Sequence, residues 1–395
     1  MSEIKIEKFI DIITLSLSSI ILMNYITFFI IFNIYLIKFY ILSYIVILLL
    51  FLFLTKFNYL YLKISFLLLL LFLLGNPTNA WDGWVVWMFK AKRIYIDQSI
   101  FGFLDNYHPW SNNDQPLIVP AFCASIAFFF EKWNEIFPKL GILFTSIPLL
   151  IYSINIFKKN IHFIFVCLSL LIISHWFING YLDGLIALYF TFCSYLIFNI
   201  FLDGKFTYLK FFNLFLFLII LSLLKNEGVV LVLLCFLQII LCLILKKKLY
   251  KKNKINYYLF FCFLPIFLWK IILIKNGISN FHLVDGLDHF LNKFKNIENW
   301  KLILNSIFKY HKFTISFALL FYLFFKYKNY FRVGYCLFVG SLHFLIFILV
   351  SFLSPMEFFW VYGHSVQRIL LTPTYLFCFM IIYEFSLKNQ KSSDN

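Results

Sequence analysis

The chain has 395 residues, of which 63% are hydrophobic and only 13% are charged, and its formal net charge is +16. Soluble domains are roughly 45–50% apolar and about 25% charged, so this composition excludes an ordinary soluble domain and indicates a polytopic membrane protein. The basic residues cluster between apolar runs, as at Lys158–Lys159 and Lys246–Lys248. Such clusters are typical of cytoplasmic loops rather than of a nucleic-acid-binding surface. We therefore expect membrane lipids around the protein and no nucleic-acid partner.

Apolar runs of about membrane-spanning length follow one another along the chain. A transmembrane helix needs about 20 largely apolar residues, so we predict an all-α polytopic membrane protein with about twelve transmembrane helices. The predicted spans are 9–32, 38–55, 62–75, 138–157, 161–178, 182–201, 211–225, 228–245, 257–274, 312–325, 331–351 and 366–385. No small-residue cleavage site follows the first of them, which is therefore predicted to be a retained helix rather than a signal peptide.

The run 117–130 is shorter, and two interpretations of it remain open: a thirteenth span, or a helix that lies at the membrane interface. Positive charge favours the interfacial helix, because a thirteenth span would move the lysine cluster 246–254 to the outside. The protein is then predicted to cross the inner (cytoplasmic) membrane several times with both termini cytoplasmic. The segments predicted to be external are 76–116, 179–184, 225–228, 275–311 and 352–365.

The polar segment 76–116 begins where Pro77 ends the third span, and Asn79 can cap a new helix there. A repeat of apolar residues every three to four positions predicts a helix with one aromatic face, lying along the membrane surface. This face would consist of Trp81, Trp84, Trp87 or Met88, and Ala91. The charged residues of the helix are Asp82 in its first turn and Lys90, Lys92 and Arg93 near its end. Alone, this pattern fits equally well an amphipathic helix whose charges suit its dipole.

Further polar groups stand at the ends of predicted spans. They are His108 and Asp114 in a Pro-rich return to the membrane, Asp183 at the start of a span, Lys225 and Glu227 in a short turn, and Glu357, His364 and Arg368 before the last span. Simple turns or side chains that extend to the interface would explain several of them. An ionisable group at membrane depth is costly and by default indicates a functional site. A lipid phosphate or Asp183 would be the partner of Arg368, whereas Lys225 and Glu227 need not pair.

The chain lacks the common sequence signatures of cofactor-dependent and hydrolytic enzymes. Its eight cysteines lie in apolar runs without a C-x-x-C pair and are predicted to behave as small hydrophobic side chains. No phosphate-binding loop, dinucleotide fingerprint, zinc-protease motif or nucleophile elbow is present. The residues leave open whether a divalent metal takes part.

In their order and spacing, these polar segments resemble the GT-C superfamily of integral-membrane glycosyltransferases. The likeness is closer to the branch with protein O-mannosyltransferases and lipid A aminoarabinose transferases, and it covers the chain from about residue 60 onward. It rests on four motifs: Trp81-Asp82-Gly83-Trp84, Asp114-Gln115-Pro116, Tyr181-Leu182-Asp183-Gly184 and Lys225-Asn226-Glu227-Gly228. The chain departs from the pattern in two extra N-terminal spans, a single acid instead of a pair at the first motif, and the lack of a soluble C-terminal domain.

The resemblance implies transfer of a sugar from a polyprenyl-phosphate donor to a lipid, glycan or protein acceptor on the external face. The implied layout is an N-terminal helix pair 1–58, a membrane domain 59–388 with an external catalytic loop 76–137, and a cytoplasmic tail 389–395. Asp82 would be the general base of an inverting displacement, with Asp114 as a second catalytic residue. The implied substrate-binding residues are Lys90, Lys92, Arg93, His108, Asp183, Lys225, Glu227, His364 and Arg368. A polytopic transporter or lipid-linked glycan flippase is the alternative function.

Overall fold

The structure is a computed structural model, which describes residues 3–55, 59–76, 78, 80–101, 111–157, 159–245, 254–278, 286–326 and 330–393. Every element within these ranges is a helix, which confirms the predicted all-α class. The chain forms two compact units, residues 1–278 and 279–395, and each is described by itself. The boundary predicted at residues 58/59 lies inside the first unit.

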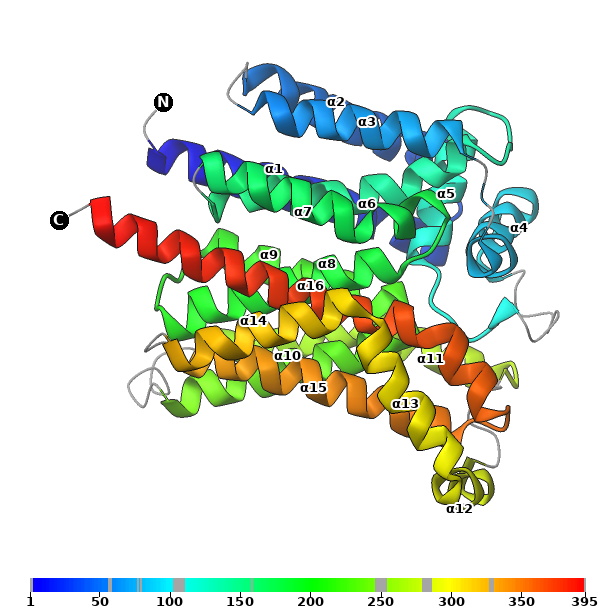
Figure 1. The fold of residues 1–395 in the computed structure, drawn as a ribbon. Helices are drawn as coiled ribbons and strands as arrows, with labels where there is room; N and C mark the ends of the chain where they lie inside the picture. The colour runs from blue at the N-terminus through cyan, green and yellow to red at the C-terminus, as the bar shows by residue number, and fades with distance from the viewer. Residues whose placement is uncertain are drawn as a thin grey trace. The chain divides into compact units, whose positions relative to one another are not determined.

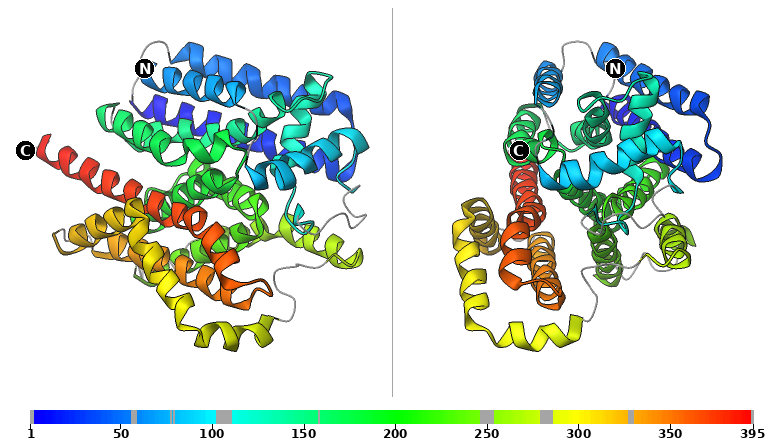
Figure 2. Two further views of the ribbon diagram at one scale, coloured as in Figure 1. Left: turned by 45° about the vertical axis from the view of Figure 1, so that its right-hand side comes forward. Right: turned by 90° about the vertical axis from the view of Figure 1, so that its right-hand side faces the viewer.

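Most helices of the first unit run roughly parallel to one another, while α4 lies across one end of them (Figures 1 and 2). The α-helices are α1 (Glu3–Ile30), α2 (Ile34–Leu54), α3 (Leu60–Gly75), α4 (Phe89–Asp97), α5 (Ile118–Phe129), α6 (Leu140–Tyr152), α7 (Lys159–Ile178), α8 (Asp183–Ile197), α9 (Tyr208–Leu224), α10 (Asn226–Leu245) and α11 (Leu264–Lys275). Two π-helical segments are Asp82–Met88 and Phe198–Leu202, and the 3₁₀ segments are Phe137–Lys139, Ser153–Asn155 and Lys254–Phe263.

Helix α1 is an integral part of the first unit, since it packs against α5, α6 and α9. Two polar contacts fix it at its N-terminal end. Lys210 Nζ of α9 lies 2.7 Å from Glu7 Oε1, and the Asn155 side chain donates a hydrogen bond of 2.8 Å to Asp11. The predicted N-terminal helix pair therefore shares its core with the helices that follow it.

Helix α5, which corresponds to the run 117–130, is a short helix in the interior of the first unit. Its 12 residues would extend about 18 Å at about 1.5 Å per residue, which is too short for a hydrocarbon core of about 30 Å. By length it therefore falls among the shorter apolar helices rather than among those long enough to cross a membrane. The helix is buried on all sides from Ile118 to Phe128 and contacts α1, α2, α4, α6 and α9, whereas an amphipathic surface helix would bury only one face.

Among the described residues, eight helices are long and apolar enough to cross a membrane, so the predicted count of about twelve is not confirmed. They are Lys5–Ile30, Ile34–Leu54, Phe137–Asn155, Asp183–Leu202, Asn226–Leu245, Tyr258–Lys275, Phe331–Leu353 and Phe358–Leu387. The predicted spans 62–75, 161–178 and 211–225 overlap the shorter apolar helices Leu60–Gly75, Asn160–Leu170 and Tyr208–Leu224, respectively. The predicted span 312–325 forms α14, a helix of 16 residues with His311 and Lys326 at its ends.

The second unit is built on three helices that pack together, α14 (His311–Lys326), α15 (Tyr330–Leu353) and α16 (Phe358–Ser393). Two shorter helices, α12 (Gly286–Lys295) and α13 (Ile297–Lys309), lie at one end of this bundle (Figures 1 and 2). Close packing of α15 on α16 depends on Gly340, where an added Cβ would lie 2.4 Å from the Phe377 ring.

Candidate functional site

The polar turn between α9 and α10 contains a buried ion pair. Lys225 lies between the last residue of α9 and the first residue of α10, and its backbone is extended there. Its Nζ atom lies 3.1 Å from Oδ1 of Asp183, the first residue of α8, and both side chains are buried. Glu227 Oε1 lies 3.3 Å from the same Nζ atom, so Lys225 and Glu227 do pair, which their sequence spacing did not require.

The same turn is joined to Asp114 through Asn226. The Asn226 side chain donates a hydrogen bond of 2.5 Å to Asp114 Oδ2, and its backbone N–H donates one of 2.9 Å to Gln115 Oε1. Asn226 is the first residue of α10, where backbone N–H groups have no partner within the helix. Lys270 of α11 completes this group: its Nζ lies 3.7 Å from Asp114 Oδ2 and donates a hydrogen bond of 2.7 Å to Asn226 Oδ1.

Asp82 is half-buried and lies at the start of the π-helical segment Asp82–Met88, next to a close backbone contact. The following residue, Gly83, packs on Asn179 and Gly180, and an added Cβ would lie 2.4 Å from the Asn179 carbonyl oxygen. Gly180 itself has a φ of 86°, which favours glycine. This contact places the start of the segment beside the loop that leads into Asp183. The chain segments that carry Asp82, Asp114 and Asp183 therefore meet in the first unit.

The aromatic face predicted from Trp81 onward does not form. Trp81 and Trp84 are 61% and 62% exposed, whereas Trp87, Met88 and Ala91 are buried. The reason is the π-helical hydrogen bonding of this segment: a π-helix has more residues per turn than an α-helix, so residues three apart, such as Trp84 and Trp87, no longer lie on one face. Short π-helical stretches occur frequently at functional sites, which agrees with the position of Asp82 at its first residue.

Lys90 is the most deeply buried of the predicted substrate-binding lysines, with a side chain that is 0% exposed. Its ammonium group donates a hydrogen bond of 2.6 Å to the carbonyl oxygen of Asn112, two residues before Asp114. Burial lowers the pKa of Lys90 to about 7, an effect that Asp114 opposes and Lys270 adds to. The Lys90 ammonium group is buried and is not open to a ligand. Its contribution to the site is the hydrogen bond that holds the backbone of Asn112, close to Asp114.

The pKa of Lys90 predicts how stability depends on pH. Below about pH 7 the lysine is charged in both the folded and unfolded protein, so burial of the charge destabilises the fold fully. Between about 7 and the ordinary value of 10.5 only the unfolded chain keeps the proton, and stability rises with pH by up to about 1.4 kcal/mol per unit. The Lys90→Met variant should lack this rise. Unfolding of both proteins in detergent between pH 6 and about 10 checks it, and equal pH slopes would contradict it.

The other predicted substrate-binding residues have partners elsewhere or belong to the second unit. Lys92 lies 3.4 Å from Glu135, and Arg93 lies 3.0 Å from Asp97 on the same helix. His364 hydrogen bonds to the Trp360 carbonyl oxygen at 2.8 Å, and Arg368 donates one of 3.2 Å to Ser365. Both belong to the second unit, whereas Asp183, which the sequence offered as a partner of Arg368, belongs to the first unit and pairs there with Lys225. His108 lies outside the described residues.

Lys139 and Lys270 were not predicted as site residues. Lys139 is fully buried and donates hydrogen bonds to the carbonyl oxygens of Asn76 and Ile178, which end α3 and α7. It thereby fastens together the segments that precede Gly83 and Gly180. Lys139 lies at the edge of the predicted span 138–157 and Lys270 lies inside the predicted span 257–274, and a single cation in such a run is the sequence signal that could have found them.

Gly83→Ala tests the close contact that positions Asp82. The new methyl group would overlap the Asn179 carbonyl, so we expect a loss of stability of about 1–3 kcal/mol from overpacking, together with reduced activity. Gly75→Ala is the matched control, because a Cβ at Gly75 meets nothing within 4 Å. Thermal unfolding in detergent measures the effect. Equal unfolding temperatures for the two variants would show that the contact is not tight.

Comparison of this chain with protein-family models, with curated proteins and with solved structures finds no match. Within the described residues, no group of three or more His, Cys, Asp or Glu side chains is arranged to hold a metal ion. The candidate site is thus defined by its own geometry: three segments with acids, a buried ion pair and a lysine, Lys270, that is partly open to solvent.

Proposed function

We propose that this protein is an integral-membrane glycosyltransferase that uses a polyprenyl-phosphate sugar as donor. The observation that carries the proposal is the meeting of the four motif segments, which lie far apart in the sequence. Gly83 contacts Gly180, Asp183 pairs with Lys225, and Asn226 bonds to Asp114. The sequence suggested a functional role for each segment separately, and the contacts between the segments support the proposal that they act together.

The proposed reaction is a displacement at the anomeric carbon of the donor sugar. Asp82 accepts the proton of an acceptor hydroxyl, whose oxygen forms the new bond to the anomeric carbon. The bond between that carbon and the phosphate oxygen breaks, and its electron pair leaves with the polyprenyl phosphate. The negative charge that develops there requires nearby cations. Lys270, which bridges Asp114 and Asn226, is one candidate, and the exposed Lys92 and the half-buried Arg93 are others.

Transfer is tested with purified full-length protein in lipid nanodiscs, a panel of radiolabelled polyprenyl-phosphate sugars, and lipid or glycan acceptors. We expect release of polyprenyl phosphate and a labelled product whose anomeric configuration is opposite to that of the donor. A transporter or flippase would instead move the intact donor across a proteoliposome without cleaving it. Translocation without bond cleavage would therefore overturn the proposal.

A further inference from the structure

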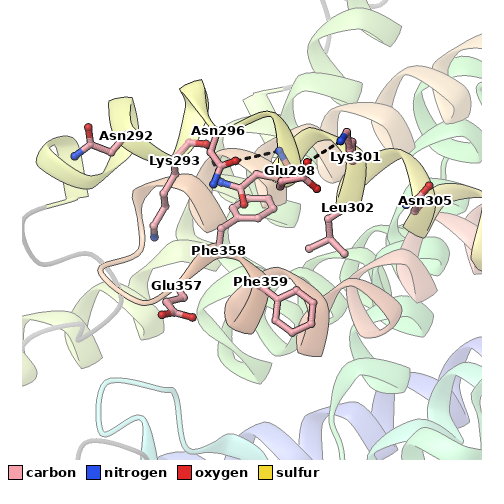
Figure 3. A pocket seen from close by; sticks show the side chains of 11 residues that line it. Asn292, Lys293, Asn296, Glu298, Lys301, Leu302, Asn305, Glu357, Phe358 and Phe359 are labelled. Atoms are coloured by element: carbon pink, nitrogen blue, oxygen red, sulfur yellow. Dashed lines mark hydrogen bonds and ion pairs between the residues drawn. The ribbon is translucent and has the colours of Figure 1, made fainter.

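A polar cleft of about 660 Å³ lies in the second unit, between α12, α13 and the start of α16 (Figure 3). This volume falls within the range of about 300–1,000 Å³ that is common for small-ligand sites. Four asparagine side chains line it, and two neighbouring phenylalanines, Phe358 and Phe359, lie on the α16 side. The asparagines are Asn292, Asn296, Asn299 and Asn305. Glu357, which the sequence analysis singled out before the last span, lines it, but none of the residues that the resemblance implied as catalytic or substrate-binding does.

The positive and negative charges of the cleft are equal in number, and most of the charged side chains have an ion-pair or hydrogen-bond partner in the protein. Glu298 and Lys301 form an ion pair of 2.7 Å along α13. Lys293 donates hydrogen bonds to the carbonyl oxygens of Ser354 and Met356, which fastens α12 to the connection between α15 and α16. Together with Glu357, the lining has two acids and two bases. A strongly charged ligand would therefore find no excess of opposite charge here.

The amide groups offer hydrogen bonds of both kinds. The Asn296 oxygen caps α13 by accepting from the Glu298 N–H, and the Asn299 side chain donates to the Lys293 carbonyl oxygen at 2.8 Å. Asn292 and Asn305 are exposed, and their side chains make no hydrogen bond within the described part of the chain. An amide side chain both donates and accepts, as a sugar hydroxyl does, so the pairing of the two groups satisfies both partners.

The aromatic side of the cleft consists of one buried ring, held by neighbouring rings, and one exposed ring. Phe358 is buried, and its ring stacks on Phe352 at 4.6 Å and on Tyr362 at 5.1 Å between centroids. The neighbouring Phe359 is instead 66% exposed at the edge of the cleft. A large exposed ring beside hydrogen-bonding amides offers an apolar surface on which the C–H face of a sugar ring can be buried.

We propose that this cleft binds a neutral carbohydrate. The inference rests on the amides, the balanced charge and the exposed ring of Phe359, and it does not depend on the proposed transferase function. The segments 275–311 and 352–365, which carry the cleft, are among those that the charge distribution predicts to be external.

Binding is measured on the full-length protein in detergent by saturation-transfer NMR and calorimetry. The probes are short soluble oligomers of glucose, galactose, mannose and N-acetylglucosamine. We expect at least one series to bind, and we expect Phe359→Ala and Asn305→Ala each to weaken that binding about tenfold. Phe308→Ala is the matched control, because Phe308 is 68% exposed on α13 but does not line the cleft, and its binding should equal that of the unmodified protein.

The outcomes separate this inference from the proposed function. Oligosaccharide binding that Asp82→Asn leaves intact supports the cleft, even if no donor is ever cleaved. If sugar is transferred but none of these oligosaccharides binds, or if Phe359→Ala binds them as well as Phe308→Ala does, the inference is overturned while the transferase proposal stands. Binding only to vesicles that contain phosphatidylglycerol, in place of oligosaccharides, would likewise overturn it in favour of an anionic headgroup.

Discussion

The Asp82→Asn variant is expected to lose about 10²–10⁴-fold of the transfer activity while keeping its fold. Asparagine has nearly the same shape as aspartate, but it cannot accept the proton of an acceptor hydroxyl. The close packing of Gly83 on Gly180 remains, so the position of residue 82 should not change. Transfer rates with a polyprenyl-phosphate sugar measure the loss, and thermal unfolding in detergent measures the fold.

Asp97→Asn provides the control for this experiment. Asp97 ends α4, the helix that directly follows the π-helical segment of Asp82, and it pairs with Arg93 at 3.0 Å, so this variant also removes one carboxylate from the region. It should keep most of its activity, because Asp97 has no proposed part in proton transfer. A correctly folded Asp82→Asn protein that transfers sugar at the normal rate would show that Asp82 is not the base.

Asp183→Asn is expected to destabilise the protein by about 3–5 kcal/mol, because it leaves Lys225 buried without its main counter-charge. The two atoms lie 3.1 Å apart, and the side chains are 3% and 8% exposed. Glu227, at 3.3 Å from Lys225, offsets part of the loss, so the lower end of the range applies. Denaturant unfolding in detergent at pH 7 gives the change in free energy.

A double variant distinguishes a charge effect from general damage to the core. Asp183→Asn with Lys225→Met removes both charges, and it should be more stable than Asp183→Asn alone. Glu298→Gln serves as a surface control, because its pair with Lys301 is largely exposed, and it should unfold close to the unmodified protein. If Asp183→Asn were as stable as this surface variant, the buried pair would contribute little.

Several features of the fold could be predicted because they depend on local composition. Helices and polar breaks follow directly from apolar runs and their ends, as at Asp183, which the sequence placed at the start of a span and the structure places at the start of α8. Helix length was less predictable. The run 117–130 forms a buried helix of 12 residues, because its apolar surface packs against five other helices rather than against lipid. Hydropathy alone does not distinguish these two environments.

The sequence predicted which segments carry the polar residues of the candidate site, but it did not predict which of these residues contact one another. Nothing in the sequence pairs Lys225 with Asp183, which lies 42 positions away, or places Lys270 beside Asp114. The predicted face of Trp81 and Trp84 failed for a related reason, since the π-helical hydrogen bonding of Asp82–Met88 changes which residues align. Lys90 was predicted to bind substrate, but its environment buries it against Asn112.

The sequence by itself determined that this is an all-helical membrane protein with polar segments at the ends of its apolar runs. These properties are set by local hydrophobicity, since a segment in lipid must satisfy its own backbone hydrogen bonds. Only the tertiary structure decided which polar groups meet. A buried charge is stable only beside a specific partner, and packing of distant helices selects that partner. The packing of α8, α9, α10 and α11 brings two such groups of partners together. They are the pair of Asp183 with Lys225, and the contacts of Asp114 with Asn226 and Lys270.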